Sequence, residues 1–366
     1  MTRTQGAHRL ASTQTDLAPL GALPTTRARG VSRRRRVPIR RIVLIVVLVL
    51  PAVIVGGSAL LWSRASAFND KVSTASAFSS KLWGPLGGSQ RVNVLLIGHS
   101  PGERDGPYLA DSLTVLSIDP GSRQTTAISI PRDLWIQGNA ALPGNGKVNE
   151  AFAVGYMAGG FPEAGSRTSR LISDVAGLRI DGWISLDFLG FAKMVEAVDG
   201  ITLDNPRTFR WALGADQLAR KEYAGSFRAG EIDLGGIDAM RYARARYTDT
   251  PIESSDFARA DRQQLILGAI RNRLEVGVPG LMRGLALLDA LGGRLHTNLS
   301  VIDLSLLAEH LSPNRRVRLA EGKILEAKRN SVGSYILLAI GRSSASDLRP
   351  LRTYIARALA NPETVK

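Results

Sequence analysis

An uncharged apolar run near the N-terminus is the feature that most constrains this chain. No Asp, Glu, Lys or Arg occurs from Ile42 to Ser63, and the run is dense in Ile, Val and Leu. Its length matches the roughly 20 residues that a helix needs to cross the hydrocarbon core of a bilayer, and Pro51 is tolerated in such helices. We therefore predict a transmembrane helix over residues 42–63, with Trp62 at its interfacial end.

The charge distribution around this run predicts its orientation. Residues 1–41 contain ten Arg and one acidic residue, Asp16, with little apolar clustering, which is typical of a disordered tail. Positively charged flanks stay on the cytoplasmic side, so we expect the basic tail in the cytoplasm and the C-terminal part outside it. The alternative is a signal peptide cleaved at a small-residue site such as Ala65-Ser66-Ala67. Residues beyond about 65 are exported in either case.

Composition narrows the chemistry of the exported part. The apolar fraction is 44%, which is ample for a packed core. The chain contains no Cys and only four His, so disulfides and thiolate-bound zinc are excluded and a His cage is not indicated. The formal net charge is +15, of which the tail contributes ten Arg less Asp16. The remainder stays moderately basic, and charge alone leaves nucleic acid, anionic lipid and phosphorylated substrates open as partners.

The rest of the chain predicts one globular domain behind a short connection. Residues 64–90 are typical of a helical stalk that ends in a Gly/Pro linker, and the globular domain is predicted over residues 91–345. Strands that alternate with helical patterns favour an α/β layered domain. We expect strands at 91–98, 112–119 and 124–130, helices at 148–158, 164–176, 186–198, 214–221, 256–275 and 279–291, and a C-terminal helix and tail over 346–366.

Arg132 directly follows a predicted strand, within the stretch Ser-Ile-Pro-Arg-Asp that ends at Asp133. Pro131 ends the strand, and the side chains behind it project from the strand's end, where open α/β sheets bind ligands. Arg132 is therefore a candidate anion ligand whose guanidinium Asp133 would orient. A structural Arg–Asp pair at a turn explains the spacing equally well.

A second group of Arg residues lies in the stretch 241–247, Arg-Tyr-Ala-Arg-Ala-Arg-Tyr. If this stretch is extended, its period of two puts Tyr242, Arg244 and Arg246 on one face. Two guanidinium groups at that separation repel each other unless an anion lies between them, and Arg binds phosphate oxygens in a bidentate manner. A solvated edge strand whose charges prevent aggregation is the alternative.

The next predicted helix supports an anion site. It begins near Asp256, and Arg259, Arg262 and Gln263 lie in its first turns at i, i+3 and i+4, which we expect to form one face. Cations at a helix N-terminus oppose the helix dipole, whereas that terminus favours bound anions. The loop 248–255 is long enough to fold the helix back beside the Arg-rich stretch. These features together predict a pocket that binds a diphosphate through several Arg.

Asp111 opens the second predicted strand and is a candidate metal ligand. Glu103, Arg104 and Asp105 lie in the loop before it. Mg²⁺ prefers a few carboxylates together with phosphate oxygens, so a carboxylate at a strand end beside a polyphosphate suits this ion. An Asp that caps a turn is the alternative.

Several motifs occur in an order that resembles the LytR–CpsA–Psr (LCP) family of the actinobacterial type. The resemblance covers about residues 91–345, and its specificity comes from the order of the motifs rather than from any one of them. The motifs are VNVLLIG, ADSLTVLSIDP, SIPRD, KVNEAF, DGWISLDFLGFAKMVEAVDGI, GIDAMRYARARY and DFARADRQQ.

The resemblance implies an α/β/α sandwich with an apolar tunnel for a polyprenyl tail. It implies a phosphotransferase that takes a glycopolymer from a polyprenyl-diphosphate carrier and joins it, through a phosphodiester, to a hydroxyl of peptidoglycan. Such transfer depends mainly on positioning and on charge neutralisation by Arg and Mg²⁺. Implied by position are a catalytic set of Asp111, Arg132, Arg244 and Arg246, diphosphate contacts from Arg132, Arg244, Arg246, Arg259, Arg262 and Gln263, and Asp111 as the Mg²⁺ ligand or an essential acid.

Two positions depart from the family pattern. Ser100 stands where the family usually has an Asp, two residues after the Gly of its first strand. Leu109 stands where the family usually has an Arg. The departures weaken the implied Mg²⁺ site more than the diphosphate site, and Glu103 or Asp105 could replace the missing carboxylate.

Two further functions remain open beside the transferase. One is hydrolysis of the same lipid diphosphate, and the other is non-catalytic binding of polyprenyl phosphates during wall assembly, which the loss of a carboxylate at Ser100 favours. A nucleic-acid-binding regulator is disfavoured, because the Arg clusters lie on the predicted exported side and no nucleic-acid-binding signature accompanies them.

Overall fold

The computed structural model divides the chain into two compact units, Met1–Gly56 and Gly57–Lys366. All described residues belong to the second unit, and among them no helix is both long and apolar enough to span a bilayer. The structure describes residues 62–75, 82, 91–101, 107–122, 124–273, 284, 287, 289–308 and 310–360.

Several predictions fall outside these described residues. The predicted basic tail lies wholly outside them, and so does the predicted transmembrane helix except for residues 62–63. The same holds for much of the predicted stalk over 64–90 and for the loop that carries Glu103, Arg104 and Asp105.

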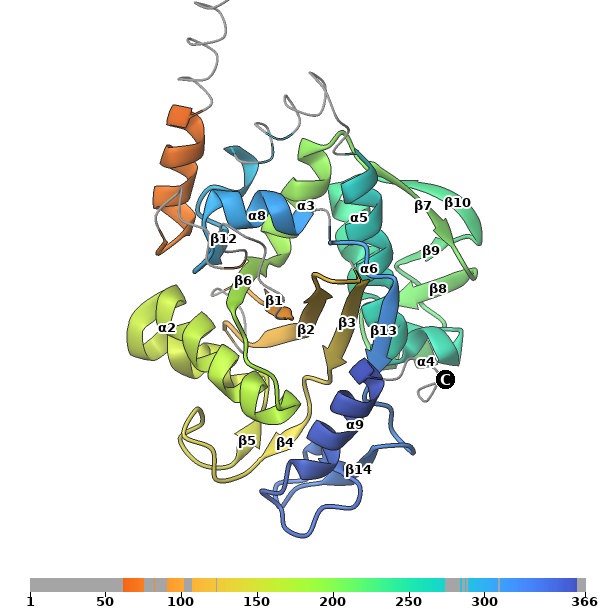
Figure 1. Cartoon of the computed structure of the whole chain (residues 1–366). Coiled ribbons are helices and arrows are strands. Elements are labelled where there is room, and N and C mark those ends of the chain that lie inside the picture. The colour runs from red at the N-terminus through yellow and green to blue at the C-terminus, as the bar shows by residue number, and fades with distance from the viewer. Residues whose placement is uncertain are drawn as a thin grey trace, which may run out of the picture. The chain divides into compact units, whose positions relative to one another are not determined.

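A six-stranded mixed sheet in the order β12-β6-β1-β2-β3-β13 forms the centre of the described unit (Figure 1). β1, β2 and β3 are successive antiparallel neighbours, and the structure confirms all three predicted strands. β6 runs parallel to β1 and β13 runs parallel to β3, whereas β12 is antiparallel to β6. The bounds are Val92–His99 for β1, Ala110–Asp119 for β2, Gln124–Ile130 for β3, Gly182–Asp187 for β6, Leu295–Thr297 for β12 and Arg315–Arg318 for β13.

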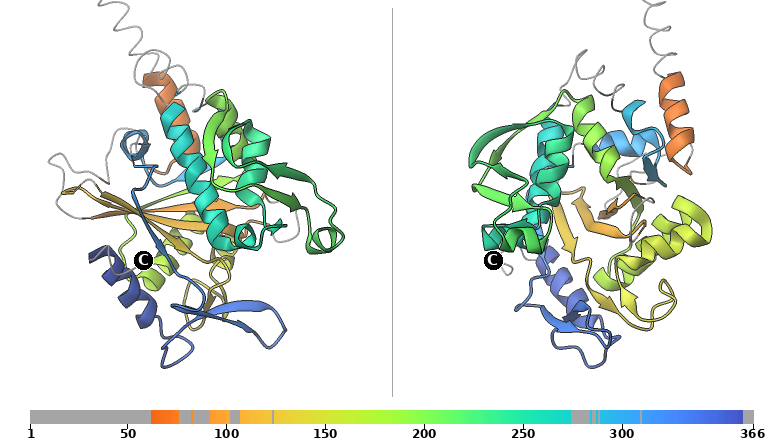
Figure 2. Two further views of the ribbon diagram at one scale, coloured as in Figure 1. Left: turned by 90° about the vertical axis from the view of Figure 1, so that its right-hand side faces the viewer. Right: turned by 180° about the vertical axis from the view of Figure 1, so that it is seen from behind.

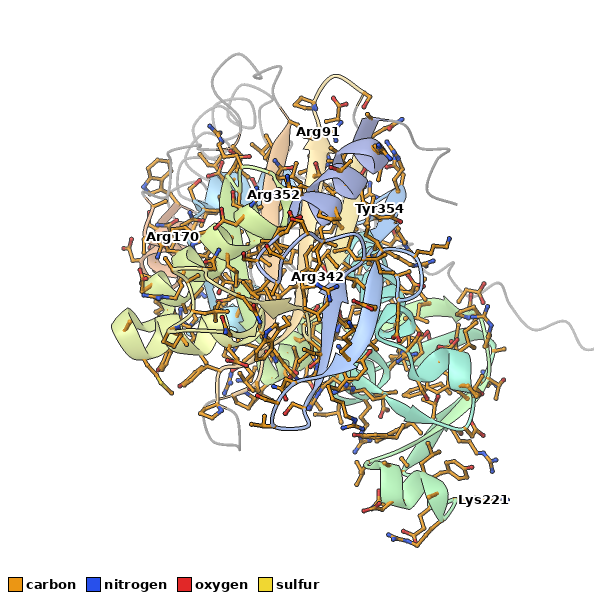
Figure 3. The ribbon with its side chains drawn as sticks, turned by 90° about the horizontal axis from the view of Figure 1, so that it is seen from below. Arg91, Arg170, Lys221, Arg342, Arg352 and Tyr354 are labelled. Carbon is orange, nitrogen blue, oxygen red and sulfur yellow. The ribbon has the colours of Figure 1, made fainter. Side chains whose placement is uncertain are left out.

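Helices cover both faces of the sheet, as the edge-on view shows (Figure 2). The helix α9 (Arg349–Ala360) is held against neighbouring segments by hydrogen bonds to main-chain carbonyls. Nε of Arg352 donates to the carbonyl of Asp174 at 2.6 Å, and the hydroxyl of Tyr354 donates to the carbonyl of Arg318 at 3.2 Å (Figure 3). One face carries α2 (Glu150–Ala176) and α9 (Arg349–Ala360), and the other carries α3 (Phe188–Ala197), α6 (Asp256–Arg273) and α8 (Val301–Ala308).

Side chains of the central strands alternate between these two faces with the period of two that a strand requires. Leu95 and Ile97 of β1 pack into one core cluster with residues of α2 and α9. Val94 packs into a second cluster with Leu299 and Leu307 on the opposite face. Because both faces are covered, the strands appear in the sequence as continuous apolar runs.

A smaller lobe follows α3 along the chain. Its core is built around Phe209, Phe227 and Tyr242, and burial raises the pKa of the Tyr242 hydroxyl, which donates to Oδ1 of Asn205 at 2.9 Å. The elements are β7 (Ile201–Asn205), β8 (Phe209–Ala212), α4 (Ala215–Ala219), β9 (Gly225–Phe227), β10 (Gly230–Leu234), α5 (Gly236–Arg244), β11 (Tyr247–Thr248) and the 3₁₀ turn η1 (Pro251–Ser254). The strands of this lobe form two sheets, with the orders β10-β7 and β11-β8-β9.

The stretch 241–247 is not a strand, so its extended interpretation was wrong. Residues up to Arg244 belong to the helix α5, and only Tyr247 enters the two-residue strand β11. Ala239, Tyr242 and Ala243 are buried at helical spacing, and Arg244 lies in the last turn, where a cation complements the helix dipole. These helical signals outweigh the period-two pattern of the Arg residues.

The helix α2 contains a sharp break. Gly159 and Gly160 have non-helical backbone angles, with φ +68° and ψ −160° at Gly160, and Pro162 follows within the element. The sequence predicted two helical segments, 148–158 and 164–176, and the break lies between them. It turns Phe161 inward, so that its ring stacks on that of His296 at 3.6 Å between centroids.

The chain before the sheet begins with an ordered helix. Residues 62–72, here called the N-terminal helix, are helical, and Phe68 and Val72 are buried against Leu291 and Leu295. Two short hairpins complete the fold, and a parallel bridge between Leu134 and Leu337 connects them. They are β4 (Trp135–Ile136) with β5 (Gly146–Lys147), and β14 (Leu325–Arg329) with β15 (Tyr335–Ala339).

Candidate active site

The edge of the sheet where β2 begins and β3 ends carries an Arg–Asp pair. The strands are antiparallel, with Leu113 opposite Ile130, so the start of one and the end of the other meet at the same edge. Pro131 ends β3 because it has no N–H for the ladder. Nη1 of Arg132 then donates to Oδ1 of Asp111 in a short ion pair. The structure thus brings two of the predicted catalytic residues into direct contact.

Asp133 lies behind Arg132 and connects it to Lys147. The Asp133 side chain is only 8% exposed, accepts from Nζ of Lys147 at 2.7 Å and lies 3.4 Å from Nε of Arg132. Charge-assisted contacts of this kind fix the geometry of their partners. Arg132 therefore has one carboxylate in front of it and one behind, which fits both an anion ligand oriented by Asp133 and a structural Arg–Asp pair.

The helix α6 brings two further predicted residues to this edge. Nη2 of Arg259 donates to the carbonyl of Asp111 at 3.2 Å, and Oε1 of Gln263 accepts from the hydroxyl of Ser112 at 2.7 Å. Arg259 and Gln263 are four residues apart and share one helix face. Together with Asp111 and Arg132 they line a small pocket, here called the polar pocket.

Arg262 points away from the polar pocket. With 3.6 residues per turn it lies about 100° around the helix from Gln263. Its side chain is 2% exposed and donates to the carbonyls of Tyr242 and Ala245 and to the carboxylate of Glu253. Burial lowers the pKa of Arg262, and the charge of Glu253 opposes that shift. The structure does not bring Arg262 together with the other predicted diphosphate ligands.

Arg244 and Arg246 lie in different surroundings. Arg244 is the last residue of α5, and its Cζ lies 3.9 Å from the ring centroid of Phe188, in cation–π geometry. Arg246 lies two residues beyond the helix end, is half-buried, and does not belong to the lining of the polar pocket. Arg244 and Arg246 are therefore not held on one face of a strand, and of the two only Arg244 lines the apolar cavity described next.

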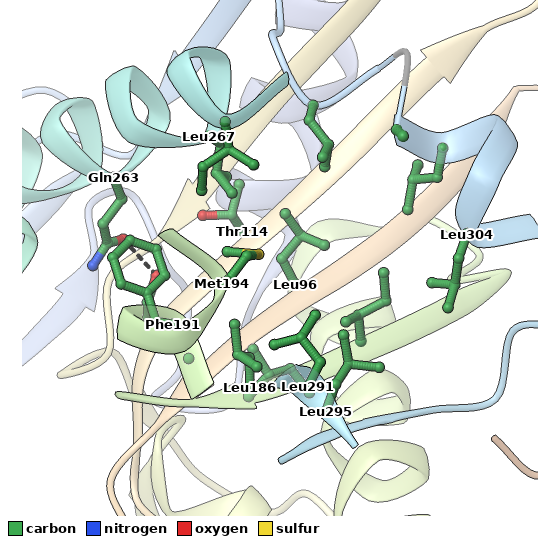
Figure 4. A pocket seen from close by; sticks show the side chains of 18 of the residues that line it. Leu96, Thr114, Leu186, Phe191, Met194, Gln263, Leu267, Leu291, Leu295 and Leu304 are labelled. Atoms are coloured by element: carbon green, nitrogen blue, oxygen red, sulfur yellow. Dashed lines mark hydrogen bonds between the residues drawn. The ribbon is translucent and has the colours of Figure 1, made fainter. Parts of the chain in front are cut away.

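A large apolar cavity adjoins the polar pocket. Its volume is about 660 Å³, and it lies between the sheet and the helices α3, α5, α6 and α8. The wall is mostly Leu, Ile, Phe and Met, with Gln263 among the few polar residues (Figure 4). Arg244 is another of these polar residues. The cavity shares four lining residues with the polar pocket, which are Ser112, Thr114, Ala260 and Gln263.

Carboxylates are scarce at this site. Within the described residues Asp111 is the one carboxylate that lines the polar pocket, and they contain no group of three or more His, Asp or Glu suited to a metal ion. Asp187 lines the apolar cavity, but its oxygens accept from the amide of Gly190 at 2.6 Å and from Arg294 at 2.8 Å. A single carboxylate suffices for Mg²⁺ only when phosphate oxygens and water supply the remaining ligands.

Two histidines, the buried His99 and the half-buried His296, lie beneath α2, outside both pockets. The ring of His99 stacks on Phe152 at 4.8 Å, as that of His296 stacks on Phe161. Burial lowers the pKa of both rings, and it lowers that of His296 to about 4, where the charge of His99 adds to the effect and Asp187 opposes it. Both imidazoles are therefore neutral at neutral pH.

Some contributors to the site were not predicted as functional residues. Ser112, Phe188 and Lys147 appeared only within the motifs ADSLTVLSIDP, DGWISLDFLGFAKMVEAVDGI and KVNEAF, and Glu253 was not singled out in the sequence. The position in KVNEAF was the available signal for Lys147, because a partly buried Lys needs an acidic partner. No spacing in the sequence indicates that Phe188 will lie under Arg244.

Comparison with known proteins places these features in context. The LytR_cpsA_psr family model matches residues 62–345. The polyisoprenyl-teichoic acid–peptidoglycan teichoic acid transferase TagU of Oceanobacillus iheyensis is 30% identical over 220 residues, which cover 59% of this chain and 61% of the relative. TagU of Enterococcus faecalis is 27% identical over 269 residues, covering 72% and 80%. The chain therefore spans about three fifths of the first of these relatives.

Solved structures share the fold. The crystal structure of Bacillus subtilis TagV matches with a TM-score of 0.53 and 23% identity, covering 75% of this chain and 98% of that chain. A structure of TagT bound to LI-WTA matches with a TM-score of 0.52 and 18% identity, covering 79% and 99%. At such identities the likeness establishes a mixed α/β fold of the same kind.

Proposed function

Because the chain belongs to the LytR_cpsA_psr family, we propose that it transfers a glycopolymer from a polyprenyl-diphosphate carrier to a hydroxyl of peptidoglycan. The family model confirms the resemblance that the ordered motifs predict. The relatives named above are teichoic acid transferases that use a polyisoprenyl carrier and peptidoglycan. Their names support the same class of donor and acceptor for this chain.

The observation that carries the proposal is the contact between the polar pocket and the apolar cavity. The donor is an amphiphile, with an anionic diphosphate joined to a long apolar tail. The polar pocket offers Arg132 and Arg259 to the anion, and the cavity offers an apolar wall to the tail. Since Gln263 lines both, the two are contiguous, and a single amphiphilic ligand is proposed to bridge them. This arrangement supports the finer prediction of a lipid tunnel.

The reaction is a phosphoryl transfer. The oxygen of the acceptor hydroxyl attacks the phosphorus that bears the glycopolymer, and a new P–O bond forms. The P–O bond to the second phosphate breaks, and polyprenyl monophosphate leaves with the electron pair. Asp111, the carboxylate of the polar pocket, takes the acceptor proton if it does not hold a metal ion, and water takes the proton otherwise. Catalysis then rests on positioning and on neutralising the charge that develops on the oxygens.

The predicted residues take different parts in this step. Arg132 and Arg259 are proposed to bind the diphosphate, because both line the polar pocket, and Gln263 positions its junction with the tail. Arg244 is proposed to neutralise the phosphate at the polar end of the cavity. Arg246 remains a proposed diphosphate contact that extends the same Arg-rich stretch.

Arg262 is proposed to support diphosphate binding indirectly, by positioning the elements that carry the diphosphate ligands rather than by touching the diphosphate. It is fully buried and binds main-chain carbonyls on both sides of Arg244. It thereby holds the end of α5 against α6, which carries Arg259 and Gln263.

A Mg²⁺ ion is proposed as the cofactor. Asp111 would hold it together with oxygens of the diphosphate, which fits the preference of Mg²⁺ for one or two carboxylates plus phosphate. When bound, the ion would supply additional charge neutralisation at the diphosphate.

The proposed location follows from the charge and hydropathy of the N-terminal part. The apolar run 42–63 is proposed to anchor the protein as a single transmembrane helix, with the basic tail in the cytoplasm and the C-terminal domain outside the cell membrane. A lipid-linked donor and an acceptor in the wall would both be within reach of an enzyme held there.

The direct test is turnover of a polyprenyl-diphosphate glycan by the purified full chain in detergent with Mg²⁺ and peptidoglycan fragments. Arg132→Ala and Arg244→Ala are each expected to lower the transfer rate by about a hundredfold or more, because each removes charge stabilisation at the transferring phosphate. Arg220→Ala is the matched control, since Arg220 is 60% exposed and pairs with Glu222 outside both pockets. No transfer by the unsubstituted protein, or full activity in both site variants, would contradict the proposal.

The loss of a carboxylate at Ser100 keeps non-catalytic binding as a second candidate function. The same assay separates the candidates. Release of a glycan phosphate into water, without transfer to peptidoglycan, would identify a hydrolase. Binding of the donor that Arg132→Ala weakens, without any bond cleavage, would identify a carrier-binding protein.

A further inference from the structure

The N-terminal helix (residues 62–72) is an integral part of the described domain. Phe68 and Val72 are 5% and 4% exposed. Oδ1 of Asn69 accepts from the amide of Val301 at 3.3 Å, and the hydroxyl of Ser73 donates to the carbonyl of Leu299. These contacts fix the helix against the segment that joins β12 to α8. The family match also begins at residue 62 and so includes this helix.

One face of this helix forms part of the wall of the apolar cavity. Ala65 and Phe68 both line the cavity. They are three residues apart, which places their side chains next to each other on the helix surface. Trp62 lies a further three residues back and is 58% exposed. An apolar stripe therefore runs along the helix from an exposed aromatic residue to the cavity wall.

This wall lies at the end of the cavity that is remote from the polar pocket. Gln263 lies at one end of the cavity, and Leu304 lies at the other (Figure 4). Phe68 belongs to the same core cluster as Leu295, with Leu304 packed against it. The residue after this helix, Ser73, bridges to Thr297 of β12, whereas Gln263 bonds to Ser112 of β2, and β6 and β1 lie between those two strands. A tail whose diphosphate sits beside Gln263 must therefore cross these strands before it meets the N-terminal helix with its distal part.

We infer that Ala65 and Phe68 of the N-terminal helix contact the distal part of the polyprenyl tail and select donors by tail length. The inference rests on the proposed function, because it takes the polyprenyl diphosphate as donor. Ala65 has the smallest side chain that still offers a Cβ, so it leaves room for a ligand beside the helix. A cavity of about 660 Å³ is within the size range of pockets that enclose one apolar ligand. A long tail must therefore extend along the whole length of the cavity.

The test compares two donors that carry the same glycan on undecaprenyl or on geranyl diphosphate, with the full chain in detergent. Ala65→Trp is expected to lower kcat/KM for the undecaprenyl donor about tenfold, because the indole takes the place of distal tail carbons whose burial favours binding. It is expected to leave kcat/KM for the geranyl donor unchanged, since a short tail ends before the helix.

Ala67→Trp is the matched control. Ala67 lies on the exposed side of the same helix, so the same substitution there leaves the cavity wall intact and is expected to change neither donor's kcat/KM. An equal effect of Ala65→Trp on both donors, or no effect on either, would overturn the inference while leaving the transferase in place. Failure of the unsubstituted protein to turn over either donor would instead overturn the proposed function.

A photo-crosslinking measurement reports the contact independently of turnover. The probe is undecaprenyl phosphate with a diazirine at the end of its tail. Trypsin cleaves after Arg64 and Lys71, so a crosslink to Ala65 or Phe68 appears on the seven-residue peptide 65–71. We expect this peptide to carry the label, and to lose most of it in Ala65→Trp. Labelling that is confined to peptides of α6 would contradict a distal contact with the N-terminal helix.

Discussion

Arg262 joins two parts of the site that come from separate segments of the chain. Its guanidinium binds the carbonyls of Tyr242 and Ala245, at the end of α5, while its backbone belongs to α6. Glu253 supplies the opposite charge at 2.7 Å and is itself only 5% exposed. Arg207 approaches the same carboxylate from the solvent side at 3.1 Å. A buried cation of this kind needs its partner, because an uncompensated charge in the interior is costly.

Glu253→Gln is therefore expected to lower the free energy of unfolding by about 3 kcal/mol, since it leaves Arg262 buried without an opposing charge. Urea-induced unfolding followed by circular dichroism measures the change. Arg207→Ala is the control, because Arg207 is half exposed and such pairs contribute at most about 1 kcal/mol. Equal effects of the two substitutions would show that Glu253 does not act through Arg262.

His296 makes the stability of the fold depend on pH. Its pKa is about 4 in the folded state, lowered first by burial and then by the charge of His99, against about 6.5 in the unfolded chain. Above pH 6.5 neither state binds the proton, so this group contributes nothing. As the pH falls from 6.5 towards 4, His296 is protonated in the unfolded chain but stays neutral in the folded state. The free energy of unfolding therefore decreases.

We expect this group to lower the free energy of unfolding by up to about 2 kcal/mol between pH 7 and pH 5. His296→Phe removes the titrating ring and retains an aromatic ring against Phe161. Urea unfolding at both pH values should therefore show a smaller pH dependence in the variant than in the unsubstituted protein. The same pH dependence in both proteins would exclude His296 as its source.

At the scale of single elements, the break in α2 places Phe161 within the core. Gly160 has φ +68° and ψ −160°, a region of the backbone map that is open almost only to Gly. Pro162 follows and cannot donate a helical hydrogen bond. The chain therefore changes direction between two helical segments, and Phe161 comes to contact both His296 and Tyr156.

Gly160→Ala is expected to destabilise the fold by about 1–3 kcal/mol, because Ala must adopt a strained backbone conformation there. Thermal unfolding measures the effect. Gly235→Ala is the matched control, since Gly235 has φ −76° and a Cβ added there would meet no atom within 4 Å. If both variants melted at the same temperature, the break would not require Gly160.

The elements that the sequence predicts well are those whose burial pattern is simple. β1 to β3 are apolar runs that end at Gly or Pro, and both faces of each strand are covered, so local pattern and packing agree. The Arg-rich stretch misled because its period of two comes from charges. The apolar residues Ala239, Tyr242 and Ala243 have helical spacing, and it is their burial that decides the conformation.

The candidate site was predictable where residues are adjacent in the sheet. Asp111 and Arg132 lie at the ends of neighbouring strands, and strand order alone brings them together. The orientation of Arg262 was not predictable from the same reasoning. Positions i, i+3 and i+4 span about 100° of a helix, and tertiary packing decides which edge of that arc faces a pocket and which faces the core.

At the scale of the whole molecule, the predicted anchor gives the clearest test. An alkaline phosphatase fused after Lys366 is expected to be active in cells, because this enzyme works only outside the cytoplasm and the proposed topology keeps only the basic tail inside. A green fluorescent protein at the same position should stay dark. The control chain lacks residues 42–63, and in it the two reporters should exchange their behaviour. A fluorescent full-length fusion would contradict the proposed topology.

The four residues shared by the polar pocket and the apolar cavity have a kinetic consequence for the proposed reaction. When the bond between the two phosphates breaks, the polymer leaves with the acceptor, while the spent carrier is still held by its tail and its remaining phosphate. The polymer-bearing product therefore departs first and the carrier second. The next donor binds at the site that the carrier still occupies, so polyprenyl monophosphate competes with the donor. Release of the carrier can therefore limit the rate of each cycle.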